Sequence, residues 1–156
     1  MKYSAILSSP LGNIGIITHQ EKLVSLDILS ISEKLIPPHD SYSKEVVSQI
    51  NHYFADPTHV FKLEYDLRGT EFQKKVWRAL LNIPSGKTLT YGMLAKLLDS
   101  GPRAIGQACR TNHIPVIIPC HRVVAAHHLG GYAGATEGRL IDIKSWLLQH
   151  EVSGSR

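Results

Sequence analysis

Short apolar runs separated by turn residues occupy the first 30 positions of the chain. Residues 3–7 and 14–18 are two such runs, with Ser9-Pro-Leu-Gly-Asn13 between them, and residues 23–29 form a third. Runs of this length, bounded by Gly, Pro and Asn, indicate β-strands joined by tight turns. The sequence therefore predicts a small β-meander at the N-terminus.

Helical spacing replaces this pattern further along. The apolar positions that recur at helical intervals are Val46, Val47, Ile50 and Phe54. They predict a helix over residues 43–54, which Asp56-Pro57 ends because the residue before a proline disfavours helical backbone. The stretch up to Gly69 is expected to be an extended linker.

The second half of the chain predicts helices with clear boundaries. Thr70 and Gln73 form a capping box, in which each side chain satisfies a free backbone N–H at the start of a helix. The apolar face behind it consists of Phe72, Val76, Trp77, Leu80 and Leu81. Pro84-Ser-Gly86 ends this helix.

Two shorter helices follow. Thr90 is placed to cap the first, and Gly101-Pro102 opens the second, which runs to Arg110 with proline at its favoured first position. Two short helices joined by a tight glycine-containing turn are typical of a helix-turn-helix. Any two-helix corner of a protein core would give the same pattern.

Charge is divided unequally between the halves. Residues 1–67 carry a net charge of −3, whereas residues 68–156 carry +7, within an overall +4. This asymmetry favours a polyanionic partner for the second half, although a solvated basic surface would look the same. No apolar run approaches the roughly 20 residues that span a bilayer, and no secretion signal is evident, so we expect a cytoplasmic protein without membrane contact.

The last helix of the predicted helix-turn-helix is slim. Ala104, Gly106 and Ala108 lie between Arg103 and Arg110, so small side chains separate two positive charges. Helices that read bases in the major groove usually carry long polar side chains. A slim helix is better suited to the minor groove, where readout is degenerate and backbone contacts dominate.

Cys120 is the candidate nucleophile. An apolar run at residues 116–118 is expected to form a short strand that ends at Pro119, directly before the cysteine. A thiol with a pKa of about 8.5 is mostly protonated at neutral pH, so it needs a base and a group that orients the base. His121 is the candidate base, acting indirectly through a water, Arg122 adds positive charge, and Glu151 could orient the histidine.

Three other interpretations of Cys120 compete with this one. An inert buried thiol is disfavoured, because the neighbouring His121 and Arg122 would need partners in the interior. A zinc site made of Cys109, His113, Cys120 and His121 would have a spacing unlike the usual zinc signatures. A cysteine hydrolase normally draws its base from a distant part of the sequence, and no oxyanion hole is evident.

Pro119-Cys-His-Arg-Val123 resembles the active-site motif of the O6-alkylguanine-DNA alkyltransferases. The resemblance covers about residues 68–151, and the N-terminal part follows by general pattern only. The further matching segments are Thr90-Tyr-Gly92, Arg103-Ala-Ile-Gly-Gln-Ala108, Arg110-Thr-Asn112, Gly131-Tyr-Ala-Gly134 and Lys144-Ser-Trp-Leu-Leu-Gln-His-Glu151. His113 follows Asn112 where the family usually has proline. This difference is expected to loosen the hinge between the last helix of the helix-turn-helix and the segment that leads to Cys120.

The resemblance implies an α+β fold with a small N-terminal β-rich, ribonuclease-H-like domain over residues 1–67. A helical winged helix-turn-helix domain would follow over residues 68–156. It also implies DNA repair by stoichiometric transfer of the alkyl group from O6-alkylguanine, with O4-alkylthymine as an expected second substrate, to Cys120. The partner would be double-stranded DNA, bound through the minor groove with the damaged nucleotide flipped out by a monomeric protein. No cofactor and no metal would be needed.

The resemblance also assigns roles at the site. His121 would take the proton of Cys120 under orientation by Glu151, and Asn112 would brace the turn that leads to the cysteine. Tyr91 would lie beside the 3′ phosphate and donate a hydrogen bond to guanine N3, and Arg103 would fill the gap in the duplex. The other expected DNA or substrate contacts are Ala104, Gly106, Cys109, Arg110, Arg122, Val123, Tyr132, Ala133 and Gly134.

Two other classes of protein share parts of this pattern. Alkyltransferase-like damage sensors have the same architecture but carry tryptophan where Cys120 stands, so this one residue separates them from repair proteins. A helix-turn-helix regulator with a redox-active cysteine would not need Tyr91, Asn112 and Glu151 together.

Overall fold

The computed structural model describes residues 2–132 and 138–154. The chain divides into two compact units, residues 1–68 and residues 69–156. The first contains a β-sheet with one helix, and the second is mainly helical, so the expected α+β class is confirmed. In the described residues, no helix is both long and apolar enough to cross a membrane.

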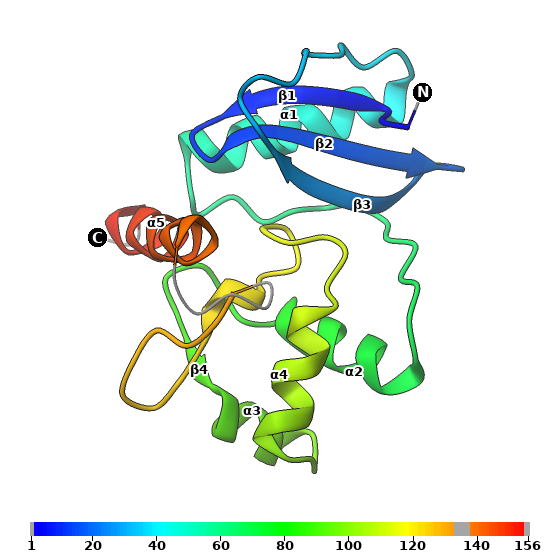
Figure 1. Ribbon diagram of the computed structural model, residues 1–156. Helices are drawn as coiled ribbons and strands as arrows, with labels where there is room; N and C mark the ends of the chain where they lie inside the picture. The colour runs from blue at the N-terminus through cyan, green and yellow to red at the C-terminus, as the bar shows by residue number, and fades with distance from the viewer. Residues whose placement is uncertain (1, 133–137, 155–156) are drawn as a thin grey trace. The chain divides into compact units, whose positions relative to one another are not determined.

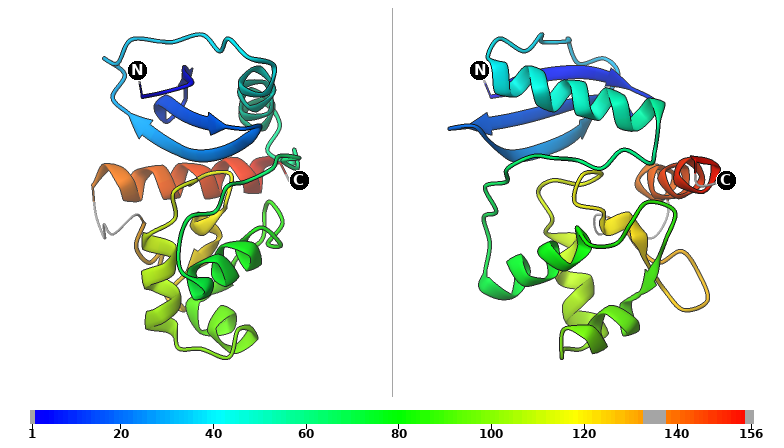
Figure 2. Two further views of the ribbon diagram at one scale, coloured as in Figure 1. Left: turned by 90° about the vertical axis from the view of Figure 1, so that its right-hand side faces the viewer. Right: turned by 180° about the vertical axis from the view of Figure 1, so that it is seen from behind.

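The first unit is a three-stranded antiparallel sheet covered by one helix. The strands are β1 (Ala5–Ser9), β2 (Gly12–His19) and β3 (Lys22–Leu29), in the order β1-β2-β3, and the helix is α1 (Ser41–Ala55). Figure 2 shows α1 lying across one face of the sheet. The predicted meander is therefore confirmed.

Backbone and capping bonds fix the boundaries of this unit. Asp40 caps α1, because its Oδ1 accepts from the backbone N–H of Ser43 at 2.8 Å, and the helix begins two residues before the predicted start. The segment after α1 is extended, as expected, and pairs with β3. Leu23 donates to the carbonyl of Glu64 at 2.8 Å and accepts from the N–H of Asp66 at 3.0 Å.

The second unit is built around α2 and a helix-turn-helix. Its described elements are α2 (Glu71–Leu80), β4 (Leu89–Thr90), α3 (Tyr91–Leu97), α4 (Pro102–Arg110), the 3-10 helix η1 (Cys120–Arg122), β5 (Val123–Val124) and α5 (Arg139–Gly154). β4 and β5 pair in parallel. Figure 1 shows α3 and α4 following each other closely at one end of this unit.

The helix starts follow from the side chains that the sequence offers. Thr70 and Gln73 form the expected capping box, and Oγ1 of Thr90 accepts from the N–H of Met93 at 3.1 Å. The indole N–H of Trp77 donates to the carbonyl of Ala108 at 2.8 Å in the buried interior. This bond joins α2 to α4, so α2 supports the helix that ends next to the candidate site.

The strand predicted at residues 116–118 is wrong. This segment forms a compact turn, in which the N–H of Ile118 donates to the carbonyl of Ile114 at 2.9 Å and Val116 has a positive φ of 74°. Asn112 closes the turn, because its Oδ1 accepts from Ile114 and its Nδ2 donates to the carbonyl of Ile118, both at 2.9 Å. The chain therefore reverses before Cys120 instead of running straight into it.

Candidate active site around Cys120

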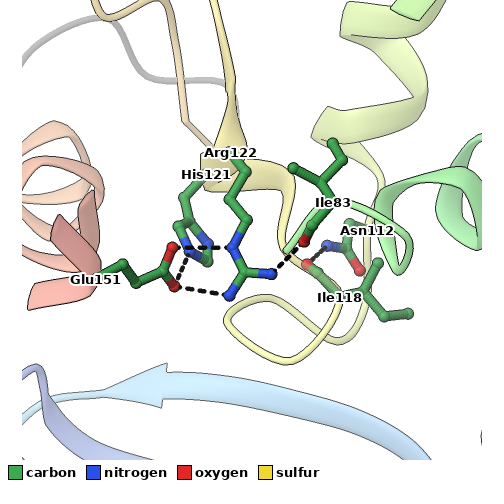
Figure 3. Close-up of polar contacts among 6 residues, drawn as sticks. All are labelled: Ile83, Asn112, Ile118, His121, Arg122 and Glu151. Atoms are coloured by element: carbon green, nitrogen blue, oxygen red, sulfur yellow. Dashed lines mark hydrogen bonds and ion pairs between the residues drawn. The ribbon is translucent and has the colours of Figure 1, made fainter. Parts of the chain in front are cut away.

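Cys120 is the first residue of η1 and is 6% exposed. Asn112 also donates a hydrogen bond to its thiol, so one side chain both closes the preceding turn and contacts the sulfur. His113, the residue after Asn112, packs edge-on against Trp77 with ring centroids 5.9 Å apart. The position of Cys120 is thus set by packing and by one asparagine, as the close-up in Figure 3 shows for Asn112 and Ile118.

The thiol of Cys120 is predominantly protonated at neutral pH. Burial raises its pKa, and the hydrogen bond from Asn112 and the positive charge of Lys144 oppose that rise without overcoming it. A nucleophile in this state must lose its proton during the reaction. The site therefore needs a base.

His121, Arg122 and Glu151 form a buried polar cluster (Figure 3). Nε2 of His121 lies 2.8 Å from Oε2 of Glu151. The guanidinium of Arg122 donates to both oxygens of the same carboxylate, at 2.9 Å each, and also to the carbonyl of Ile83. α5 supplies the glutamate, whereas η1 supplies its two partners. The cluster therefore links α5 to η1, which we call the cysteine turn because it begins at Cys120.

The protonation states in this cluster follow from its geometry. Burial lowers the pKa of His121, against the opposing effect of Glu151, so the imidazole is neutral at pH 7. Burial alone would raise the pKa of Glu151, but hydrogen bonds from His121 and Arg122 outweigh it and hold that pKa far below its usual range. An ionised carboxylate only accepts hydrogen bonds, so Nε2 of His121 carries the proton.

The other ring nitrogen of His121 is consequently a proton acceptor. Nδ1 is buried and makes no hydrogen bond within the described part of the chain. A neutral imidazole with one nitrogen fixed as a donor to a carboxylate and the other left basic has the arrangement of a general base. Within the described residues, Nδ1 of His121 makes no direct hydrogen bond to Cys120, so the indirect contact through a water stays a prediction.

A second group of residues surrounds the cysteine from the side of the helix-turn-helix. Tyr91, at the start of α3, has its pKa raised to about 12 by burial and by the nearby sulfurs of Cys109 and Cys120, and it accepts from the backbone N–H of Gly131. Gly130 has a φ of 80°, and a Cβ there would lie 3.0 Å from the Tyr91 ring. A glycine is therefore needed where this loop passes the tyrosine.

The exposed face of α4 carries the expected positive charges. Arg103 and Arg110 are exposed, and Ala104 and Gly106 are half-buried between them. A Cβ on Gly106 would meet no atom within 4 Å. Packing inside the protein thus gives no reason for a glycine at this helical position.

Most of the predicted residues come together in the second unit. Tyr91, Cys109, Asn112 and Val123 lie around Cys120, and Tyr132 is buried. Arg122, which was expected among the DNA contacts, is instead directed inward onto Glu151, and its side chain is 11% exposed. Ala133 and Gly134 fall outside the described residues.

Sequence reasoning missed Lys144, which is fully buried and donates to the carbonyls of Val123 and Gly131, both at 2.8 Å. A signal was available, because Lys144, Leu147 and Glu151 are spaced i, i+3 and i+7 and share one helix face. A charged residue on a face that is otherwise directed inward is a candidate for a buried polar contact.

The two cysteines do not belong to a metal-binding cluster in the part of the chain that the structure describes. No group of three or more His, Cys, Asp or Glu side chains there could hold a metal ion. Both cysteines are free thiols. Burial raises the pKa of Cys109 to about 12, and a thiolate at neighbouring Cys120 adds to this rise.

The sequence matches one protein-family model over residues 71–153, described as the DNA-binding domain of 6-O-methylguanine DNA methyltransferase. Among curated proteins, the methylated-DNA–protein-cysteine methyltransferase of Methanosarcina acetivorans is 38% identical over 159 aligned positions, which cover 97% of this chain and 99% of the relative. The protein of the same name from Mycobacterium leprae is 36% identical and covers 94% and 92%, respectively.

Solved structures agree with these sequence matches. The crystal structure of Mycobacterium tuberculosis O6-methylguanine methyltransferase superposes with a TM-score of 0.81 at 37% identity, covering 97% of this chain and 93% of the other. A crystal structure of Mycobacterium tuberculosis OGT in complex with DNA gives a TM-score of 0.79 at 37% identity, with coverages of 96% and 92%.

Proposed function

The chain belongs to the methylated-DNA–protein-cysteine methyltransferase family, and we propose that it repairs DNA directly by moving an alkyl group from O6 of guanine to Sγ of Cys120. The single observation that carries this proposal is the buried arrangement of Cys120 beside a neutral histidine that an ionised glutamate orients. It supplies a protonated thiol with the base that it needs.

The chemistry is a displacement at the alkyl carbon. The proton of Cys120 passes through a water molecule to Nδ1 of His121, and the resulting thiolate attacks the alkyl carbon. The S–C bond forms as the C–O6 bond breaks, and guanine leaves with the bonding electron pair. A hydrogen bond from Tyr91 to guanine N3 stabilises this leaving anion, and the raised pKa of Tyr91 supports its role as a donor.

The transfer consumes the protein. Water does not displace the sulfur from a methyl thioether, because a thiolate is a poor leaving group at an alkyl carbon, so each molecule acts once, without a cofactor. O4-alkylthymine presents the same kind of alkyl–oxygen bond, and we propose it as a second substrate. Both lesions pair poorly with the opposite base. Extruding such a base from the duplex costs less free energy than extruding a well-paired one, which favours repair of the lesion over binding of normal bases.

DNA binding is assigned to the helix-turn-helix. Arg103 and Arg110 on α4 would contact the phosphates or the duplex gap, and the small residues Ala104 and Gly106 would let the helix approach the minor groove closely. Arg103 would take the place of the extruded nucleotide. One copy of α4 is enough for these contacts, so we propose that the protein binds DNA as a monomer.

The alkylguanine pocket is assigned to the residues around Tyr91. The carbonyls of Cys120 and Val123 would accept from the exocyclic amino group of guanine, and Cys109 would form the facing wall. Tyr132, Ala133 and Gly134 are expected to contribute contacts to the alkyl group. A non-reactive damage sensor is disfavoured, because it would not carry a cysteine at position 120.

Mass spectrometry of the protein after incubation with a duplex containing O6-methylguanine tests this function. We expect a gain of about 14 Da on the peptide that holds Cys120, with no more than one equivalent transferred. Cys120→Ser should bind the duplex and transfer nothing, and Cys109→Ser should still transfer. A methyl group on Cys109, or repeated turnover, would refute the proposal.

A further inference from the structure

Lys144 is a buried charge whose position packing alone does not explain. Its side chain is fully buried in α5, and burial lowers its pKa to about 8, so it remains mostly protonated at pH 7. Transferring an ammonium group out of water is costly unless the charge is well compensated. An apolar side chain would fill the same space more cheaply, so the contacts of the ammonium group are informative.

All of these contacts lead to the candidate site. Nζ donates at 2.8 Å to the carbonyl of Val123, directly after the cysteine turn, and at 2.8 Å to the carbonyl of Gly131, directly before Tyr132. The same nitrogen lies 5.8 Å from the ring centroid of Tyr91. A single ammonium group therefore joins the segment after Cys120, the loop that leads to Tyr132 and the start of the helix-turn-helix.

We propose that Lys144 is a positioning residue that orients the Val123 carbonyl for recognition of the guanine amino group and holds the Gly131 loop beside it. The inference rests on the proposed function, in which that carbonyl accepts from the exocyclic amine. A carbonyl oxygen has two lone pairs, so the bond from Lys144 by itself still leaves one for the base. Fixing the carbonyl before the base arrives lowers the cost of ordering it on binding.

The arrangement also explains why a lysine serves here. An ammonium group has three N–H donors in a compact head, so it can bond two carbonyls and still face the Tyr91 ring. A neutral amide reaches less far and cannot donate to both carbonyls with the same geometry. The positive charge near Cys120 additionally favours its thiolate, although recognition of the base depends on the hydrogen bonds.

The test compares two lesions that differ by one amino group. Duplexes with O6-methylguanine or O6-methylhypoxanthine, which lacks the exocyclic amine, are reacted with excess protein, and the single-turnover rates are measured. The wild-type protein should prefer O6-methylguanine. In Lys144→Met this preference should fall by roughly threefold to tenfold, the range expected for one lost hydrogen bond.

Lys44→Met is the matched control, because it makes the same replacement at an exposed position on α1. It should retain the wild-type preference. If Lys144→Met slows both lesions equally, or slows neither, the positioning role is overturned. Circular dichroism of Lys144→Met distinguishes this outcome from a loss of the fold, which would also slow both lesions equally.

A second variant keeps the inference testable if Lys144→Met does not fold. Lys144→Gln keeps an amide group, but on a shorter and uncharged side chain that cannot reach both carbonyls, so its preference should also fall at least threefold. A wild-type preference in Lys144→Gln would overturn the inference. Failure of the proposed function would look different, because the wild-type protein itself would then transfer no methyl group to Cys120.

Discussion

Oε2 of Glu151 lies 2.8 Å from Nε2 of His121, a contact between residues 30 positions apart that joins the C-terminal helix to the cysteine turn. Arg122 binds the same carboxylate through two nitrogens. The arginine keeps the glutamate ionised, and the ionised glutamate fixes which nitrogen of the histidine carries the proton. The basicity of His121 toward Cys120 thus depends on a residue that does not touch the sulfur.

Glu151→Gln should slow methyl transfer at pH 7 by at least about tenfold, in the range that general-base catalysis contributes. Removing the carboxylate lowers the basicity of His121, because Glu151 favours its protonated form. The apparent pKa of Cys120 should therefore rise, as measured by the pH profile of alkylation with iodoacetamide, and His121→Gln should act in the same direction. DNA affinity should stay unchanged in both variants.

Glu71→Gln provides the control, because the Glu71 side chain is 91% exposed at the start of α2. Its transfer rate and thiol ionisation should match those of the wild type. If Cys120 ionises unchanged in Glu151→Gln and His121→Gln, the relay is refuted. The positive charges around the site would then be the remaining influence on the thiol.

The buried cluster should make stability fall on acidification. The pKa values of His121 and Glu151 are both lower in the folded protein than in the unfolded chain, so the unfolded chain binds more protons as pH falls. The contribution of His121 is lost below about pH 6.5, and that of Glu151 below about pH 4.3. Both are fully present above these values.

Urea unfolding at several pH values measures this effect. At pH 7, Glu151→Gln should be less stable than the wild type by on the order of 3 kcal/mol, because Arg122 keeps a buried charge without its counterion. The difference should shrink toward pH 3, because below about pH 4.3 this carboxylate takes up a proton in the unfolded wild-type chain, whereas its lowered pKa keeps it ionised in the folded protein. A difference that stays constant from pH 7 to pH 3 would contradict the assigned pKa directions.

Local signals made most of the fold predictable. Thr70, Thr90 and Pro102 mark helix starts by interactions with their own neighbours in sequence, and the structure begins helices at these points. The turn before Cys120 was not predictable in this way. An apolar run at residues 116–118 fits a strand or a buried turn equally well, and the deciding interactions come from the Asn112 side chain.

The reacting groups of the site and Glu151 were predictable from the sequence, but the partners of Arg122 and Lys144 were not. The five-residue motif around Cys120 contains the nucleophile, the base and Arg122 in sequence order. The pairing of Arg122 with Glu151 and of Lys144 with Val123 spans 29 and 21 positions, and no local pattern states which side chains meet at such separations. The family resemblance placed Arg122 among the DNA or substrate contacts, whereas its guanidinium is directed inward onto Glu151.

Asn112→Ala should destabilise the protein by about 1 to 3 kcal/mol, because the N–H of Ile114 loses its partner and the carbonyl of Ile118 keeps only its bond from the N–H of Cys120. It should also raise the pKa of Cys120, since the asparagine hydrogen bond favours the thiolate. Urea unfolding and the iodoacetamide pH profile measure the two effects. The exposed Asn82→Ala should change neither, and an unaltered thiol profile in Asn112→Ala would argue against the asparagine contact.

Gly106→Ala should stabilise the protein and weaken DNA binding. Alanine favours a helix interior by about 0.5 to 1 kcal/mol over glycine, and the added Cβ meets no protein atom within 4 Å. The same Cβ would stand between α4 and the minor groove. Thermal unfolding measures the change in stability, and titration with duplex measures the change in DNA affinity. Ser48→Ala on α1 is a helix control that should leave the DNA affinity unchanged. Unchanged affinity in Gly106→Ala would place the DNA elsewhere.

Arg103→Ala should separate base extrusion from chemistry. Arg103 is exposed at the start of α4 and lies outside the buried cluster around Cys120, so its loss should not alter the thiol or its base. Repair of O6-methylguanine in a duplex requires that the base be extruded, at a cost of a few kcal/mol, whereas free O6-benzylguanine needs no extrusion. The variant should therefore lose at least about tenfold in rate on the duplex, equivalent to about 1.4 kcal/mol, and little on the free base.

Arg68→Ala supplies the comparison, because Arg68 pairs with Asp66 and belongs to the first unit. It should react with both substrates as the wild type does. Binding of undamaged duplex should weaken as salt rises in every variant, and Arg103→Ala should show a smaller salt dependence if the arginine also meets a phosphate. If Arg103→Ala loses the same factor in rate on the duplex and on the free base, Arg103 takes part in the chemistry. If its rates on both substrates equal those of the wild type, Arg103 has no role in base extrusion.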